Sequence, residues 1–214
     1  MRFPATLLFA LSLFATAGCA APGAGLFNGR DFAGWEFVAV PAMDIKEACA
    51  LKPGGVIAVA GKSVGFLATT ATHANYRLHA EWRWSDKPGN SGVLVHITGA
   101  PANGTAWPLC FQAQLKATRA GDLLPMNGAT FAEKLSTAPG AKTPQLDRAA
   151  DSSEKPAGEW NTCDITCRGD TIEVVVNGVR QNTVTHAAPA AGRVGFQLEG
   201  VPFELRQVRL TPLD

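Results

Sequence analysis

The sequence lacks any excess of charge. Its 19 Lys and Arg residues nearly balance 18 Asp and Glu residues, and a net charge of +1 gives no electrostatic case for a nucleic acid or an anionic membrane surface as partner. Charged residues make up only 17% of the chain, which is low for a helical protein and ordinary for a β-rich one. The 22 glycines and 14 prolines indicate many turns.

The sequence also lacks the short motifs that mark common enzyme classes. It contains no nucleophile elbow, P-loop, dinucleotide-binding fingerprint or zinc motif. No cofactor is therefore evident from the residues, although a divalent metal ion stays open.

Cysteine is scarce, with five residues in the chain. Cys163 and Cys167 lie in one expected strand, where their Cα atoms would be about 13 Å apart, too far for a disulfide. No C-x-x-C or Cys/His metal spacing involves Cys49 or Cys110 either. We expect these four residues to be buried free thiols, with a bridge between strands as the alternative.

No apolar run in the N-terminal segment is long enough to anchor the chain in a bilayer. Arg2 is followed by the apolar residues 7–14, a run too short to span a membrane. This arrangement predicts an export signal in residues 1–18.

The end of this signal resembles a bacterial lipobox. The sequence Ala15-Thr16-Ala17-Gly18-Cys19 places small residues before a cysteine, which predicts lipidation of Cys19 and a short linker over residues 19–25. Leu is more usual where Thr16 stands. The alternative is ordinary cleavage after Ala17 or Ala21. We therefore expect an exported protein, either periplasmic or anchored in the outer membrane.

From residue 26 onward the chain is a succession of short β-type runs separated by turn residues, without a helical period. Asn177-Gly178 supplies the two positive-φ residues of a type I′ hairpin turn. The pattern predicts an all-β sandwich or jelly roll formed by one domain, residues 26–214. The expected strands are residues 56–60, 65–70, 76–84, 93–98, 109–115, 161–167, 171–176, 179–184, 193–198 and 203–210.

Residues 129–158 interrupt this pattern. The segment is rich in Ala, Pro, Lys, Ser and Asp and shows no strand period. Loops of this length in a compact domain are often functional or poorly ordered.

Several expected strands place polar side chains on one face of a sheet. In residues 76–84 the even positions are apolar, whereas Glu81 and Arg83 fall on the polar face. The same alternation exposes His96 on another strand. If these polar faces belong to one side of a curved sandwich, the side chains converge.

Their chemistry suits a polyhydroxylated ligand. Glutamine side chains offer both a donor and an acceptor, Trp107 can stack on a sugar ring, and carboxylates or imidazole can transfer protons. The predicted catalytic residues are Glu81, Arg83 and His96. The predicted substrate-binding residues are Asn90, Ser91, Trp107, Gln112, Gln114, Asp122, Gln197 and Glu199.

Each of these assignments has a plainer alternative. Glu81 and Arg83 could form a surface cross-strand ion pair worth under about 1 kcal/mol. His96 could be a satisfied histidine of a polar face, and Asn90-Ser91-Gly92 could be only a turn.

Residues 26–213 resemble the 3-keto-disaccharide hydrolase domain family, long catalogued as a domain of unknown function. Short motifs follow in the family's order at residues 26–35, 81–83, 90–93, 158–161, 176–178 and 195–200. The resemblance implies a concanavalin A-like lectin/glucanase jelly roll of two antiparallel sheets. It also implies an exported protein that acts on 3-keto-glycosides.

The implied reaction begins with removal of the proton next to the ketone, continues with loss of the aglycone, and ends with addition of water. The resemblance then makes His96 or Glu81 the base and Arg83 the group that stabilises the enolate. Many relatives carry Glu where this chain has Gln112, and an amide cannot transfer a proton. A non-catalytic carbohydrate-binding module is therefore the alternative, followed by a structural envelope protein with a merely solvated polar face.

Overall fold

The structure is a computed structural model that describes residues 23–101 and 105–214. The predicted signal peptide and Cys19 lie outside the described residues, so export and lipid attachment stay predictions. Within the described ranges no helix is long and apolar enough to cross a membrane.

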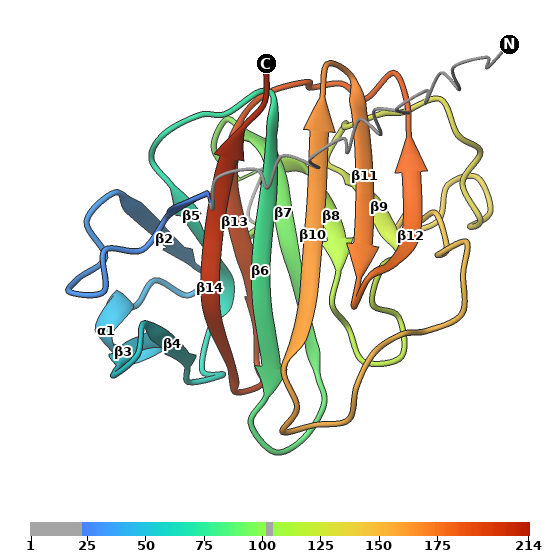
Figure 1. The fold of residues 1–214 in the computed structure, drawn as a ribbon. Helices are drawn as coiled ribbons and strands as arrows, with labels where there is room; N and C mark the ends of the chain where they lie inside the picture. Colours follow the sequence, from blue (N-terminus) through green and yellow to red (C-terminus); the bar gives the residue numbers. More distant parts are fainter. Residues whose placement is uncertain (1–22, 102–104) are drawn as a thin grey trace, which may run out of the picture.

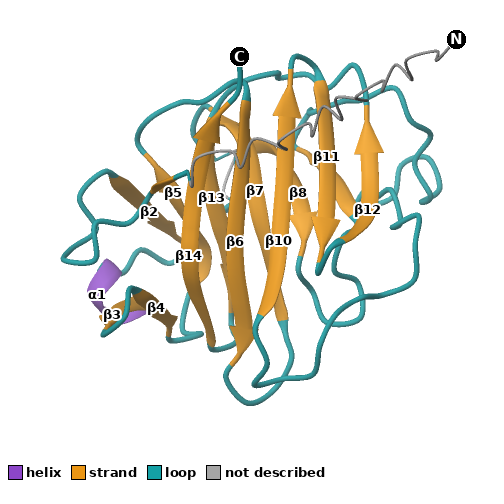
Figure 2. Ribbon diagram, in the orientation of Figure 1, coloured by secondary structure: helices purple, strands orange, loops and turns teal. Residues whose placement is uncertain are grey.

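The described chain folds as a sandwich of two antiparallel sheets, as predicted (Figures 1 and 2). Sheet A has the order β12-β11-β10-β6-β14-β4-β3, with β1 paired to β14, and sheet B has the order β2-β5-β13-β7-β8-β9. The elements are β1 (Ala24–Gly25), β2 (Trp35–Ala39), α1 (Ile45–Ala48), β3 (Cys49–Lys52), β4 (Val56–Val59), β5 (Val64–Thr69), β6 (Tyr76–Trp84), β7 (Asn90–Thr98), β8 (Leu109–Gln114), β9 (Leu123–Met126), β10 (Asn161–Arg168), β11 (Thr171–Val176), β12 (Val179–Val184), β13 (Arg193–Glu199) and β14 (Phe203–Pro212).

Alternation of buried and exposed residues builds each layer. In β6 the even-numbered residues, among them Leu78, Trp82 and Trp84, are buried, while the odd-numbered residues between them face outward. Because successive side chains of a strand point to opposite faces, this pattern seals one face of sheet A against sheet B. The main hydrophobic core therefore fills the space between the two sheets.

All of the expected strands are present, with boundaries that differ by a few residues at most. Residues 90–92 begin β7, so the interpretation of Asn90-Ser91-Gly92 as a turn is wrong. Asn177 and Gly178 have φ values of 48° and 79°, which confirms the predicted hairpin turn between β11 and β12.

The four cysteines among the described residues are buried and free, as predicted. Burial raises the pKa of each thiol. These thiols therefore stay protonated at neutral pH and are poor nucleophiles.

Residues 129–158 form no strand or helix, but they are tied to the sandwich. Isolated bridges join Leu146 to Leu123 in β9 and Thr130 to Ala188. The backbone N–H of Ser136 donates to the carbonyl of Gln145, which closes a turn within the loop. The loop is therefore attached to β9 and to the segment that follows β12.

Candidate functional site

The outer face of sheet B carries a row of polar side chains on three adjacent strands. Gln197 of β13 pairs with Gly92 of β7, which pairs with Gln114 of β8. Two residues further along these strands, Glu199 of β13 pairs with Asn90 of β7. Paired residues of an antiparallel sheet point to the same face, so these side chains share one surface. The sequence predictions for these residues placed them on one face correctly.

A continuous set of hydrogen bonds links this row. Gln112 Nε2 donates to Gln114 Oε1 at 3.0 Å and to Gln197 Oε1 at 2.8 Å. Gln197 Nε2 and Asn90 Nδ2 both donate to Glu199 Oε2. We call these five residues the amide row. Asn90 Oδ1 is buried and has no hydrogen-bond partner among the described residues.

Gly92 makes room for the amide row. A Cβ atom at this position would lie 2.6 Å from Cγ of Gln112, closer than real contacts allow. Without that atom, the Gln112 side chain crosses β7 and reaches Gln197. The glycine therefore has a steric role that the turn interpretation of residues 90–92 did not anticipate.

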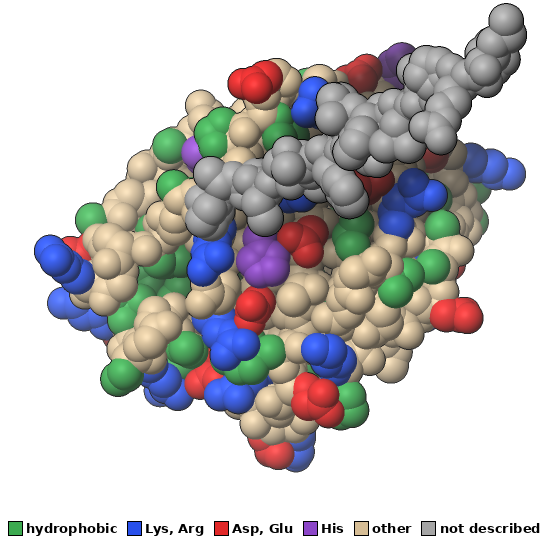
Figure 3. Space-filling model, in the orientation of Figure 1, with side chains coloured by type: hydrophobic (Ala, Val, Ile, Leu, Met, Phe, Trp, Pro, Cys, Tyr) green, Lys and Arg blue, Asp and Glu red, His purple; other side chains and the backbone are tan. Residues whose placement is uncertain are grey.

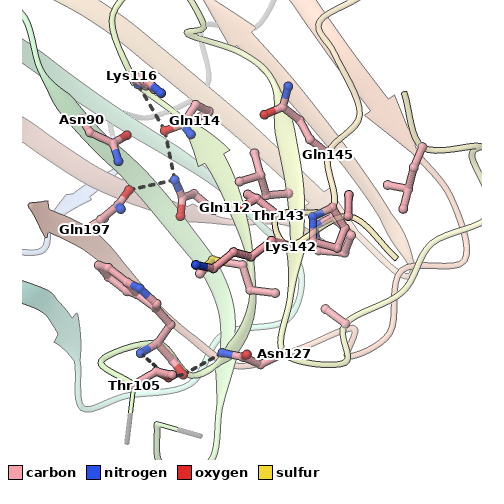
Figure 4. Close-up of a pocket in the computed structure, with 18 of the residues that line it drawn as sticks. Asn90, Thr105, Gln112, Gln114, Lys116, Asn127, Lys142, Thr143, Gln145 and Gln197 are labelled. Carbon is pink, nitrogen blue, oxygen red and sulfur yellow. Dashed lines mark hydrogen bonds between the residues drawn. The ribbon is translucent and has the colours of Figure 1, made fainter. Parts of the chain in front are cut away.

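The amide row lines a cleft of about 1060 Å³. Figure 4 shows the amide side chains of Asn90, Gln112, Gln114 and Gln197 on the strands, with residues of the long loop facing them across the cleft. Lys142 extends from this loop into the cleft (Figure 4). Among the described residues that line the cleft, Glu199 is the only carboxylic acid.

Trp107 also lines the cleft, where it is half-buried. Its carbonyl oxygen accepts a hydrogen bond of 2.7 Å from Nδ2 of Asn127, which follows β9. The structure therefore brings Trp107 together with the amide row, as the sequence analysis expected.

Asp122 does not line the cleft, contrary to its predicted role in binding substrate. Its side chain has no exposed surface and accepts a hydrogen bond of 2.8 Å from the backbone N–H of Arg148. It also forms an ion pair with Arg119, which does line the cleft. Burial raises the pKa of Asp122, and the bonds from Arg148 and Arg119 oppose that rise. Asp122 thus anchors the long loop and positions Arg119.

Ser91 is the second corrected binding residue. Its neighbours Asn90 and Gly92 point to the outer face of sheet B, so the alternation turns Ser91 toward the interior. The side chain is fully buried, and its hydroxyl donates to the carbonyl of Gln197 at 2.8 Å. Ser91 therefore fixes the pairing of β7 with β13 and cannot contact a ligand in the cleft.

Glu81 and Arg83 lie on the outer face of sheet A, on the opposite side of the sandwich from the cleft. Glu81 pairs with Arg206, and Arg83 Nε donates to Glu204 Oε2 at 2.7 Å. Both guanidinium groups also stack over Trp160, at 4.6 and 4.0 Å from its ring centre. The prediction that these two residues share a site with the glutamines is therefore wrong.

This face carries acidic, basic and histidine side chains close together over sheet A (Figure 3). His79 adds to the set, because its Nδ1 lies 2.8 Å from a carboxylate oxygen of Asp164, which raises the pKa of His79. Glu204 bonds to Lys52 and Arg83, which together lower the pKa of Glu204. The charges on this face satisfy one another, which is typical of a solvated outer sheet surface.

His96 lies between the two sheets and has no exposed surface. The pairing of β7 shifts register between Val95 and Thr98, and His96 has a φ of 54°. This bulge turns the imidazole toward Tyr76 and Phe111 of the core. Its Nδ1 lies 2.9 Å from the carbonyl of Pro189, and burial lowers the pKa of His96. His96 therefore lies in the core and does not line the cleft, contrary to the expectation that it shares a face with the glutamines.

Several cleft residues were missed by the sequence analysis. Lys116 and Arg119 come from the connection between β8 and β9, and Lys142 and Gln145 come from the long loop. The unusual length of that loop was the only signal for its contribution. Within the described ranges, no three His, Cys, Asp or Glu residues are grouped so that they could hold a metal ion.

The fold and the cleft define a jelly roll of the type found in carbohydrate-binding and glycan-cleaving proteins. A family model for the 3-keto-alpha-glucoside-1,2-lyase-like domain matches residues 24–211. The chain belongs to this family, which confirms the resemblance seen in the sequence. The family indicates a glycosyl hydrolase-like or carbohydrate-binding jelly roll.

Solved structures share this fold at low sequence identity. A candidate glycosyl hydrolase from Parabacteroides distasonis is 21% identical, with a TM-score of 0.63 over 88% of this chain and 93% of that chain. A carbohydrate-binding module from Bacillus subtilis is 12% identical, with a TM-score of 0.57 over 83% of this chain and 94% of that chain. At these identities the similarity establishes the fold alone. A search of curated proteins gives no match.

Proposed function

We propose that the cleft on sheet B binds a 3-keto-glycoside and cleaves it by elimination followed by hydration. The observation that carries this proposal is the amide row, which places four amide side chains next to the carboxylate of Glu199. Amide groups that donate and accept along one surface suit the hydroxyl groups of a sugar, and a carboxylate beside them suits proton transfer.

The ketone makes this chemistry possible with a single carboxylate. A base removes the proton from the carbon between the ketone and the anomeric carbon, and the electrons pass to the ketone oxygen to form an enolate. The enolate then expels the aglycone, which takes up a proton, and water adds to the resulting double bond. The sum is hydrolysis without the paired carboxylates of ordinary glycosidases.

In this proposal Glu199 is the base and Lys142 stabilises the enolate. Glu199 Oε2 accepts bonds from Asn90 and Gln197, which fix the orientation of the carboxylate. Lys142 reaches the cleft from the facing loop and carries a cation (Figure 4). A cation held where negative charge develops stabilises the transition state more than the ground state.

The test is turnover of 3-keto-glucosides by Glu199→Gln. We expect kcat/KM to fall by about 100-fold or more, because a general base typically contributes 10²–10⁴ in rate. Release of the aglycone is measured by chromatography. Lys142→Gln belongs in the same assay and is expected to lower kcat more than it raises KM.

Glu173→Gln is the matched control, because Glu173 lies on β11 of sheet A, away from the cleft. A folded wild-type protein that leaves 3-keto-glucosides of both anomers intact would contradict the proposal. Turnover by Glu199→Gln at the wild-type rate would reject Glu199 as the base.

A non-catalytic carbohydrate-binding function is the second candidate. The observation in its favour is that Glu199 is the only acid among the described cleft residues and already accepts two hydrogen bonds. Tight binding of sugars without turnover, unchanged in Glu199→Gln, would favour this candidate over the enzyme.

A further inference from the structure

The cleft is larger than one sugar ring requires. Its volume of about 1060 Å³ lies just above the roughly 300–1,000 Å³ found for pockets that hold drug-sized ligands. The amide row occupies only the part of the cleft formed by β13, β7 and β8. The remaining space is therefore large enough for a second part of the ligand.

The remaining lining includes a set of apolar residues from different segments, beside the polar and cationic side chains already described. Leu124, Pro125 and Met126 belong to β9, while Leu135 and Pro144 belong to the long loop. Together with Trp107, which precedes β8, we call these residues the apolar wall. The cleft thus has two chemically different parts, an amide row and an apolar wall.

The apolar wall is firmly supported. Met126 packs against a second hydrophobic cluster on the outer face of sheet B, which contains Phe66 and Leu94. The sulfur of Cys110 lies 3.8 Å from the sulfur of Met126. Asn127 Nδ2 holds the carbonyl groups of both Trp107 and Pro108. A ligand that contacts this wall meets a preformed surface and needs little reorganisation.

We propose that the cleft selects glycosides whose aglycone is apolar and aromatic, a proposal that rests on the function proposed above. The sugar ring lies on the amide row, and the aglycone lies against Trp107, Met126 and Leu135. Aromatic rings gain from stacking on an indole, and burial of apolar surface favours binding in proportion to the area removed from water.

The position of the aglycone in the proposed reaction supports this arrangement. The aglycone is the group expelled, so it extends from the anomeric carbon away from the ring that the amide row holds. The apolar wall lies beside the amide row, since Leu124 of β9 pairs directly with Gln112 of β8. The leaving group would therefore enter the apolar part of the cleft.

The experiment compares ketosides with the same sugar and leaving groups of similar acidity. The 3-keto derivatives of methyl glucoside, phenethyl glucoside and a glucose disaccharide are assayed for kcat/KM. We expect kcat/KM for the phenethyl compound to be about tenfold higher than for the methyl compound. Trp107→Ala should remove most of this difference, whereas Trp107→Phe should remove little of it. Trp160→Ala, on the opposite face, is the control and is expected to leave the ratio unchanged.

Binding of the unoxidised methyl and phenethyl glucosides is measured in parallel by calorimetry. Turnover of all three ketosides without preference for the phenethyl compound would overturn the proposed aglycone and leave the proposed reaction standing. A preference for the disaccharide would assign the wall to a second sugar and overturn it equally. Absence of turnover for all three ketosides would reject the proposed reaction. The aglycone preference would then be tested by calorimetry, where the phenethyl glucoside is expected to bind about tenfold more tightly than the methyl glucoside.

Discussion

Position 92 carries no side chain, and this allows Gln112 to lie flat across β7. The backbone of Gly92 is extended strand, so the requirement for glycine is a matter of space and not of backbone conformation. The nearest atoms to an added Cβ all belong to Gln112. Gly92 therefore controls the position of the Gln112 amide. The hydrogen bonds to Gln114 and Gln197 depend on that position.

Gly92→Ala tests this dependence. The added methyl group should displace Gln112 and break its two bonds to the neighbouring glutamines. We expect affinity for a bound sugar to fall by about tenfold, which corresponds to about 1.4 kcal/mol, because a displaced Gln112 no longer presents its amide to the sugar. Calorimetric titration measures the change. Gly25→Ala, in β1, is the control because its Cβ would have ordinary contacts. Unchanged affinity in Gly92→Ala would show that the amide row does not hold the ligand.

Among the elements, most strands were predictable, but β1 and three of the four strands at the ends of the two sheets were not. The fourth, β12, was predicted because it forms a hairpin with β11. The alternation over Tyr76–Trp84 gives β6 with its observed bounds. The missed strands β2, β3 and β9 each lie at the end of a sheet, where only one neighbour and little burial shape the sequence. Pro125 within β9 is tolerated there because an edge strand needs fewer backbone donors.

The candidate site was predictable only in part, for two physical reasons. Alternation assigns a side chain to one face of its strand but does not say which sheet contains the strand, so Arg83 of sheet A and Gln114 of sheet B look alike. A bulge in β7 then changes the alternation at His96. Both features arise from pairing between distant segments, which no local pattern records.

The long loop depends on Asp122 for its attachment. Asp122→Ala removes the acceptor for the backbone N–H of Arg148 and the buried partner of Arg119. We expect a loss of about 2–3 kcal/mol in the free energy of unfolding, together with faster hydrogen exchange of the amides at residues 141–145. Denaturation and exchange mass spectrometry measure the two effects.

Asp151→Ala is the control for the loop, because Asp151 is exposed and lies in the same segment. Exchange in Asp122→Ala that matches the wild type would show that other contacts hold the loop against the cleft.

At the scale of the whole molecule, the sandwich separates two polar surfaces. The outer face of sheet A carries charges that pair with one another, whereas the outer face of sheet B carries the amide row and the cleft. The core between them keeps Glu81 and Arg83 apart from any ligand in the cleft. Substitutions on the two faces should therefore have different consequences.

Arg83→Gln is expected to leave kcat/KM for 3-keto-glucosides unchanged. It should lower the free energy of unfolding by about 1 kcal/mol or less, because the pair is partly exposed and Glu204 keeps its bond to Lys52. Steady-state kinetics and urea denaturation test the two statements. A large loss of activity at unchanged stability would return Arg83 to the list of catalytic candidates.

The amide row has a fixed direction. At one end the backbone N–H of Lys116 can only donate, which turns the oxygen of Gln114 toward it. At the other end ionised Glu199 can only accept, which turns the nitrogen of Gln197 toward it. Both ends impose the same orientation on Gln112, whose nitrogen must face two oxygens. An ionised glutamate at position 112 has no proton to donate. Its carboxylate would face the side-chain oxygens of Gln114 and Gln197, which are also acceptors. In this chain the neutral amide at position 112 thus matches the two ends of the row, and the sugar meets a surface whose donors and acceptors have fixed places.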